Sequence, residues 1–335
     1  MKEDAKTNIT KSSQDNAILF LINNKSLIIL VLLMIAAQIA SGGLFFGTSN
    51  LFSVIRQTTV MCLMGLGFAV VLGAGNLDLS IGHMLGFLSV IYALTTLRYS
   101  IVVAILVTLA AGVLCGMANG LLAIKLGLTP FILTLATGQM FRGMAYLVSN
   151  GESIGGLGNQ VKAIGQGVMF GGAPVTILYI VVAAFIMAVV MYRTRFGRHV
   201  IATGSNDNAA KVSGVDVDWI KIASFIIMGF MNAVAAIVVT GRISIAMPNV
   251  GDGMEMDAIA AVVIGGTALN GGKVKIAGTV IGCFILGIIS NLLNLAGVSS
   301  FWQWFTKGVI IILATLIDAR TDDFFKNRRS RVQVN

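Results

Sequence analysis

The stretch GAGNLDLSIG, residues Gly73–Gly82, places a carboxylate between two long apolar runs. TTVMCLMGLGFAVVL precedes it and HMLGFLSVIYALTTL follows it, and neither run contains Asp, Glu, Lys or Arg. Runs of this length and composition are typical of membrane helices. The stretch is therefore interpreted as a polar joint between two helices that cross a membrane.

The composition supports a membrane protein. Hydrophobic residues make up 56% of the chain and charged residues only 11%, whereas a soluble domain carries about 25% charged residues. The net charge of +9 fits basic cytoplasmic loops better than a nucleic-acid partner. Cys62, Cys115 and Cys283 lie in separate apolar segments, so neither a metal site nor a disulfide framework is expected.

The apolar runs predict an all-α, polytopic membrane protein with about ten transmembrane helices, because one helix needs about 20 apolar residues to cross a bilayer. The predicted spans are 26–46, 58–75, 81–97, 101–124, 129–148, 173–192, 222–241, 255–270, 275–295 and 301–318. The first run is interpreted as an anchor, since it is long and lacks a clear cleavage site.

The distribution of Lys and Arg predicts the orientation of these spans. With the N-terminus inside, 17 of the 23 basic residues fall in cytoplasmic segments, and only Arg56, Arg98, Lys162 and Arg242 fall outside. This bias predicts that both termini are cytoplasmic. The chain then divides into an N-terminal segment 1–25, a transmembrane domain 26–318 with a cytoplasmic loop 193–221, and a C-terminal tail 319–335.

Glycines spaced four residues apart predict close helix packing. Gly112, Gly116 and Gly120 share one face of the fourth span, and Gly278 and Gly282 do so in the ninth. Small residues at this spacing let two helix backbones approach each other.

The cytoplasmic loop contains SNDNAAKVSG, residues Ser205–Gly214, which resembles a short helix with both ends marked. Ser205 or Asp207 can cap its N-terminus, and Gly214 can end it in the left-handed conformation. Two turns of helix are not stable alone in water. The segment must therefore dock, either on the protein's own membrane helices or on a partner.

Catalytic and nucleotide-binding patterns are missing. ALNGGKVK, residues 268–275, has one residue too many after Gly266 for a phosphate-binding loop, and Val274 replaces the required Ser or Thr. His83 and His199 are interpreted as interface residues. No catalytic, cofactor-binding or metal-binding residue is predicted, so the chain is not expected to be an enzyme, and no row of acidic residues suggests a proton-driven carrier.

Four stretches together resemble the permease subunit of bacterial ABC monosaccharide importers, in the ribose, xylose and allose branch of binding-protein-dependent systems. They are GNLDLSIG (75–82), TRFGRHVIATGSNDNAAKVSGV (194–215), MDAIAAVVIGGTALNGGKVKIAGTVIG (256–282) and NLLNLAGVS (291–299). The likeness covers roughly residues 50–318. It departs from the family's usual residues at Asn76, Ser205 and Val274.

The resemblance implies a multi-pass protein of the bacterial cytoplasmic (inner) membrane that moves a pentose or hexose. It implies three kinds of partner: cytoplasmic ABC ATPase subunits, a periplasmic sugar-binding protein, and a second permease copy or paralogue. ATP would then be hydrolysed by the ATPase subunits, and the loop helix would couple to them. The residues expected to couple are Ser205, Asn206, Asp207, Ala209, Ala210, Lys211 and Gly214.

Other functions stay open. The same machinery could carry another small polyhydroxylated solute, such as a furanosyl quorum signal. An ion-coupled secondary carrier would need no ATPase, and a membrane enzyme would need a catalytic group that the sequence does not offer.

The opening stretch has two interpretations. By the charge count it lies at or near the inner membrane boundary, where Asp78 or Ser80 would accept a free N–H at the start of the next helix. Alternatively, Asn76 and Asp78 line the exit path or touch the ATPase.

A second polar cluster is expected at the outer side of the membrane. It combines residues of three predicted helices, the fifth, eighth and tenth, which either pair as ionic staples or form a polar mouth for a hydroxylated substrate. The candidate path residues are Asn76, Asp78, Gln139, Arg142, Glu255, Asp257, Gln303 and Lys307.

Overall fold

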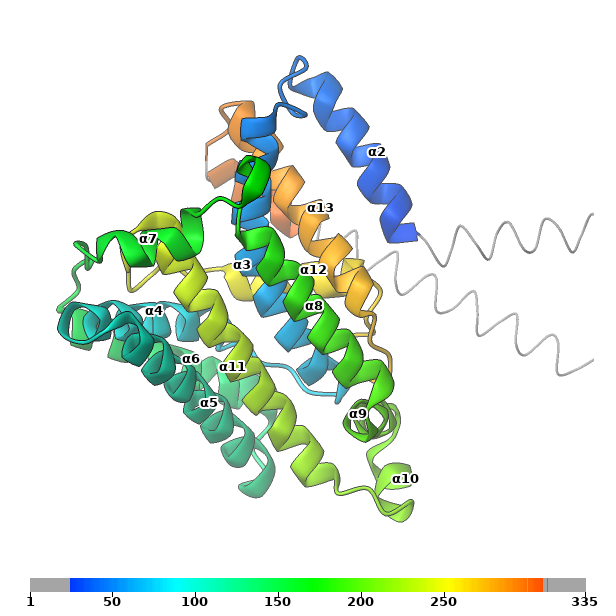
Figure 1. Ribbon diagram of the computed structural model, residues 1–335. Coiled ribbons are helices and arrows are strands. Elements are labelled where there is room, and N and C mark those ends of the chain that lie inside the picture. Colours follow the sequence, from blue (N-terminus) through cyan, green and yellow to red (C-terminus); the bar gives the residue numbers. More distant parts are fainter. Residues whose placement is uncertain (1–24, 300, 310–311, 313–335) are drawn as a thin grey trace, which may run out of the picture.

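The computed structural model describes residues 25–299, 301–309 and 312, so the predicted terminal segments lie outside the described residues. In this part of the chain the fold is all-α, without a β-strand (Figure 1). The long helices are α2 (Lys25–Ala40), α3 (Thr48–Gly73), α4 (Ile81–Arg98), α5 (Ile101–Lys125), α6 (Pro130–Ser149), α8 (Thr176–Arg193), α11 (Val217–Ile243) and α13 (Ile276–Leu295). The shorter elements are α7 (Gly158–Gln166), the 3₁₀ turn η1 (Phe170–Gly172), α9 (Arg195–Ser205), α10 (Asp207–Val212), α12 (Met254–Ile264) and a helical segment over 301–309.

Seven helices are long and apolar enough to cross a membrane, namely α3, α4, α5, α6, α8, α11 and α13. The polytopic, all-α prediction is therefore confirmed. α2 is apolar but shorter, at 16 residues.

The eighth predicted span, 255–270, differs from the structure. Its helix α12 has 11 residues, which rise about 16 Å and so cover roughly half of a 30 Å hydrocarbon core. Gly265 and Gly266 end the helix, and the chain continues as turns to Lys275. The tenth predicted span is helical over 301–309, and most of its remainder lies outside the described residues.

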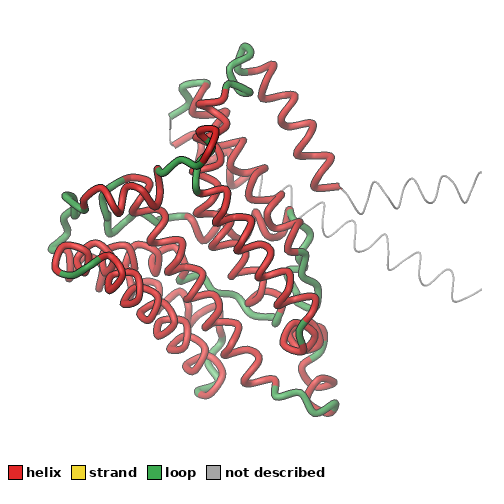
Figure 2. Tube along the Cα trace, in the orientation of Figure 1, coloured by secondary structure: helices red, strands yellow, loops and turns green. Residues whose placement is uncertain are grey.

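α3 and α11 form the centre of the bundle (Figure 2). In their most apolar windows 83% and 72% of residues are buried, against 22% in α5 and in α8. A helix that is apolar on every side but mostly exposed within one chain faces lipid or another protein. α5 and α8 therefore form the outer layer.

The predicted glycine faces are confirmed as packing surfaces. A β-carbon built on Gly112 would lie 2.4 Å from the backbone oxygen of Gly229 in α11, and one on Gly116 would lie 2.2 Å from that of Phe225. Real β-carbons do not approach this closely, so α5 and α11 meet backbone to backbone. Gly278 and Gly282 place α13 against α12 in the same way.

The loop 193–221, which is predicted to be cytoplasmic, holds a helix that the sequence did not predict. α9 begins after Thr194, whose Oγ1 accepts the Gly197 N–H at 3.3 Å and caps the helix. The break at Thr194 turns the chain out of α8, and α9 then carries it to α10.

Candidate translocation site

Residues 74–80 link α3 to α4 as a buried, non-helical segment, which Figure 1 shows passing back into the bundle. Asp78 Oδ1 accepts the Ser80 backbone N–H at 2.9 Å and the Ser80 hydroxyl at 2.6 Å. Asp78 is thus the acceptor that the start of α4 needs, as predicted, whereas the Ser80 side chain acts as a donor to it.

The two predicted polar clusters are not separated by the thickness of the membrane, and that expectation was wrong. A β-carbon on Gly82 would lie 2.1 Å from Glu255 Oε2 and 2.5 Å from the Gly251 backbone oxygen. The start of α4 therefore contacts the start of α12. The reason is the extended backbone: seven residues from 74 to 80 can span about 20 Å, which carries Asp78 away from the end of α3.

The segment before and at the start of α12 carries two ion pairs. Asp257 Oδ2 lies 2.5 Å from the Lys307 ammonium nitrogen. Asp252 Oδ2 lies 3.5 Å from an Arg142 guanidinium nitrogen, and its Oδ1 lies 3.7 Å from His83 Nε2. α4 and α6 thus contact the turn before α12 through polar and charged side chains, and α12 contacts the 301–309 segment through an ion pair.

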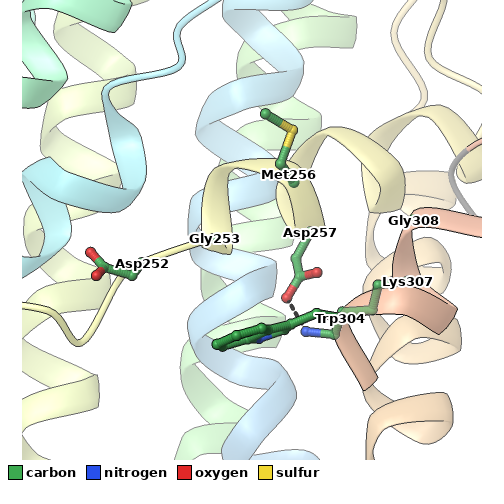
Figure 3. A pocket seen from close by; sticks show the side chains of 7 residues that line it. All are labelled: Asp252, Gly253, Met256, Asp257, Trp304, Lys307 and Gly308. Atoms are coloured by element: carbon green, nitrogen blue, oxygen red, sulfur yellow. Dashed lines mark hydrogen bonds and ion pairs between the residues drawn. The ribbon is translucent and has the colours of Figure 1, made fainter. Parts of the chain in front are cut away.

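A cavity of about 460 Å³ opens beside the first of these pairs (Figure 3). The residues that line it are Asp252, Gly253, Met256, Asp257, Trp304, Lys307 and Gly308. Figure 3 shows the Trp304 ring beside the Asp257–Lys307 pair, with Asp252 on the far side of Gly253. A flat indole next to charged hydrogen-bonding groups offers both an apolar face and polar edges.

Four of the predicted path residues lie elsewhere or are enclosed. Gln139 is exposed on α6. Gln303 Nε2 donates to Asn294 Oδ1 at 2.8 Å and thereby ties the 301–309 segment to the end of α13. Asn76 and Asp78 are buried within the bundle and do not line the cavity.

The sequence reading missed Asp252 and Trp304. Asp252 stands between Gly251 and Gly253 in a turn outside the predicted spans, where a charged residue is ordinary and gives no signal of a site. Trp304 shares its helical segment with Phe301, Trp302 and Phe305, and an aromatic residue within an apolar run carries no charge that would mark it as part of a site.

The loop helix α10 has the predicted ends with one correction. Its N-cap is Asn206, whose Oδ1 accepts the Ala209 N–H at 3.0 Å, and not Ser205 or Asp207. Ser205 is the last residue of α9, and the Asp207 carboxylate pairs with Lys221 of α11. Asn206 lies at the break between α9 and α10 and has an extended backbone, as an N-cap residue typically has.

Gly214 ends α10 as predicted. It has a φ of +83°, and its N–H donates to the Lys211 oxygen while the Val215 N–H donates to the Ala210 oxygen, both at 3.0 Å. This is the Schellman pattern of backbone bonds, which a glycine adopts without strain.

The faces of α10 differ in exposure. Ala210 is only 4% exposed because it packs against the protein's own chain, whereas Val212 is 92% exposed. Asn208, Ala209 and Lys211 are exposed as well.

Glycines join the loop 193–221 to the segment that follows α3 and to the turns that follow α12. The Gly272 N–H donates to the Gly73 backbone oxygen at 3.0 Å. A β-carbon on Gly271 would lie 2.8 Å from the Gly75 α-carbon, and one on Gly204 would lie 2.5 Å from the Gly272 nitrogen. We call these five residues the glycine junction. It brings three of the stretches that carry the family resemblance to one point.

The fold and the site together define a multi-pass membrane permease of the cytoplasmic membrane: an apolar helical bundle with an open cavity lined in part by charged side chains. The chain belongs to the family described as "branched-chain amino acid transport system / permease component", which matches residues 50–315. Charges placed among apolar helices are costly unless they face protein or water.

The similar proteins include permease proteins for ribose and for xylose. The ribose import permease protein of Bacillus subtilis (strain 168) is 38% identical over 279 residues, covering 82% of this chain and 86% of that protein. The ribose import permease protein of Escherichia coli (strain K12) is 37% identical over 306 residues, covering 89% and 94%. The xylose transport system permease protein of E. coli (strain K12) is 30% identical and covers 89% and 93%. No solved structure matches the chain.

Proposed function

We propose that the chain is the membrane subunit of an ATP-driven importer for a monosaccharide, a pentose or a hexose. The observation that carries this is the identity of 30–38% to ribose and xylose permeases over more than four fifths of each chain. A likeness that spans nearly the whole of both chains supports a shared type of cargo. A furanosyl signal of similar size and polarity is the second candidate.

The cavity beside Trp304 supports a sugar as the cargo. Its volume of about 460 Å³ is ample for one monosaccharide. An aromatic face can cover the C–H surface of a sugar ring, and the Asp257 carboxylate and Lys307 ammonium can bond its hydroxyls. In this proposal Arg142, Asp252 and Glu255 continue the polar wall of the path.

An ATPase subunit is proposed to dock on α10. The helix has six residues, which is too short for independent stability, and it presents an almost fully exposed Val212 next to Lys211. The Ala210 side packs inward, so the docking surface is the opposite side of the helix.

A second permease copy or a paralogue is proposed to complete the path, with a periplasmic binding protein above it. The polar cavity opens beside Trp304 and Lys307 on a helical segment whose aromatic side chains are exposed. Charged groups at membrane depth do not face lipid. A neighbouring subunit across this opening would enclose them.

Uptake by the assembled system tests the proposal. The permease, the ATPase and the binding protein are reconstituted in liposomes, and uptake of labelled ribose, xylose and glucose is measured with and without ATP. We expect ATP-dependent uptake of one of these sugars. Uptake by the chain alone, driven by an ion gradient, would favour a secondary carrier instead.

Trp304→Leu tests the site itself, with Trp302→Leu as the matched control. Both tryptophans are exposed on the same helical segment, but only Trp304 lines the cavity. We expect Trp304→Leu to lower uptake at least fivefold and Trp302→Leu to leave it within twofold. Equal losses would assign the aromatic residues to folding or lipid contact.

A further inference from the structure

Asp78 is fully buried, and its two carboxyl oxygens are in different situations. Oδ1 accepts two hydrogen bonds from Ser80, whereas Oδ2 is enclosed and has no hydrogen-bond partner. The Asn119 side chain of α5 lies beside the carboxyl, because its amide nitrogen donates to the same Ser80 hydroxyl at 2.9 Å.

The surrounding groups offer acceptors but few donors. The amide oxygens of Asn119 and of Asn232 in α11 are also buried and unpaired. The Asn232 amide nitrogen is engaged with the Ile81 backbone oxygen at 2.8 Å. Each of these three buried oxygens would be satisfied by a donor hydrogen.

The described residues place no ion-pair partner beside this carboxyl. Cys115 of α5 lies close to it but brings no positive charge, and His83 of α4 directs Nε2 toward Asp252. Thr134 of α6, whose hydroxyl oxygen accepts the N–H of the adjacent Leu79 at 3.0 Å, is neutral. A buried carboxylate without a counter-charge is far less stable than the neutral acid, so such a group takes up a proton.

We propose that Asp78 is a neutral carboxylic acid in the folded permease and that its Oδ2–H donates to the Asn119 amide oxygen. One proton then supplies the missing donor and removes the buried charge together. The result is a hydrogen bond between two uncharged side chains that links the segment 74–80 to α5, next to the contact between α4 and α12.

The test compares the same chemical change at two aspartates. Asp78→Asn replaces a neutral acid by a neutral amide of the same shape, whereas Asp257→Asn removes a charge that is paired with Lys307. Each variant, together with Asp78→Ala, is purified in detergent, and its thermal unfolding midpoint is measured. We expect Asp78→Asn to stay within a few degrees of the unchanged protein and Asp78→Ala to lose far more. Failure of Asp78→Asn to fold overturns the proposal, because it preserves the neutral shape.

Infrared difference spectroscopy supplies a direct readout. The spectrum of the unchanged protein minus that of Asp78→Asn should show the C=O band of a protonated carboxylic acid at neutral pH, well above the ordinary carboxyl pKa of about 4. A carboxylate band in its place overturns the proposal. A midpoint that rises with Na⁺ in the unchanged protein but not in Asp78→Asn would assign a bound cation instead. Neither measurement needs sugar or ATPase, so the result is independent of the proposed function.

Discussion

Gly204, near the end of α9, packs against the backbone of Gly73, at the end of α3, and leaves no room for a methyl group. A β-carbon on Gly204 would lie 1.9 Å from the Gly73 oxygen. Gly73 leads directly into the segment that holds Asp78. Its backbone oxygen accepts a hydrogen bond from the N–H of Gly272, which lies in the loop that follows α12. A displacement of α9 and α10 would therefore also displace the segment 74–80 and the loop that follows α12, because both contact Gly204 or Gly73 through backbone atoms.

Gly204→Ala should disturb this contact. The added methyl must push apart two backbones that have no flexible side chain to yield, and overpacking of this kind costs about 1–3 kcal/mol. We expect a lower thermal unfolding midpoint, and in the protein that does fold a loss of ATP-driven uptake larger than the loss of folded protein. Both quantities are measured on the same reconstituted preparation.

Gly143→Ala is the matched control. Gly143 lies inside α6 with nothing within 4 Å of its would-be β-carbon, and alanine favours a helix interior by about 1 kcal/mol over glycine. This variant should be as stable as the unchanged protein or more so, with normal uptake. If Gly204→Ala behaves like Gly143→Ala, the glycine junction does not transmit movement.

Val212→Asp should weaken docking of the ATPase. Val212 is 92% exposed at the end of α10, so a carboxylate there leaves the permease fold intact but places a charge on the proposed interface. We expect at least a tenfold loss of ATPase subunit recovered by pull-down, with unchanged amounts of permease in the membrane. Ala210 is a poorer site for this test because it packs against its own chain.

Asn206→Ala gives a graded comparison on the same helix. It removes the N-cap of α10 and should cost about 0.5–2 kcal/mol of local helix stability. ATPase recovery should therefore fall less than in Val212→Asp. Undiminished recovery and uptake in Val212→Asp would exclude this face of α10 as the docking surface.

The periodic features of the fold could be predicted from the sequence, while the path of the backbone between them could not. Glycine spacing predicted the α5 face correctly because packing of small residues depends on helical period alone. The prediction that Asp78 lies at the inner membrane boundary was wrong, because the charge count indicates only on which side of the membrane a loop lies. The extended segment 74–80 returns the chain into the bundle, and hydropathy does not distinguish this from a turn at the surface.

The candidate site was predictable to a similar degree. Asp257 and Lys307 were named as possible partners, since charges at membrane depth need neighbours, and the structure pairs them. The partner of Arg142 was missed because Asp252 lies in a glycine turn outside the apolar runs. The cap of α10 was placed one residue away, because Ser205, Asn206 and Asp207 are all competent caps.

The Asp257–Lys307 pair allows a structural staple to be separated from a transport role. Lys307→Met leaves Asp257 almost buried and unpaired, so it should destabilise the protein by about 3 kcal/mol, at the low end for buried pairs because Lys307 is partly exposed. Adding Asp257→Asn removes the stranded charge and should restore most of that stability. We expect uptake to stay at least tenfold low in the double variant. If uptake returns with stability, the pair only holds helices together.

The orientation in the membrane can be tested with two single cysteines in a variant that lacks Cys62, Cys115 and Cys283. The charge distribution predicts that α10 is cytoplasmic and α7 external. Asn159→Cys and Ser213→Cys both replace exposed residues in these elements, so each thiol should react readily on its own side. A membrane-impermeant maleimide added to spheroplasts should label Asn159→Cys, and it should label Ser213→Cys only after the membrane is opened. The reverse pattern would place α10 outside, where no cytoplasmic ATPase could dock on it, and would invert the whole threading of the chain.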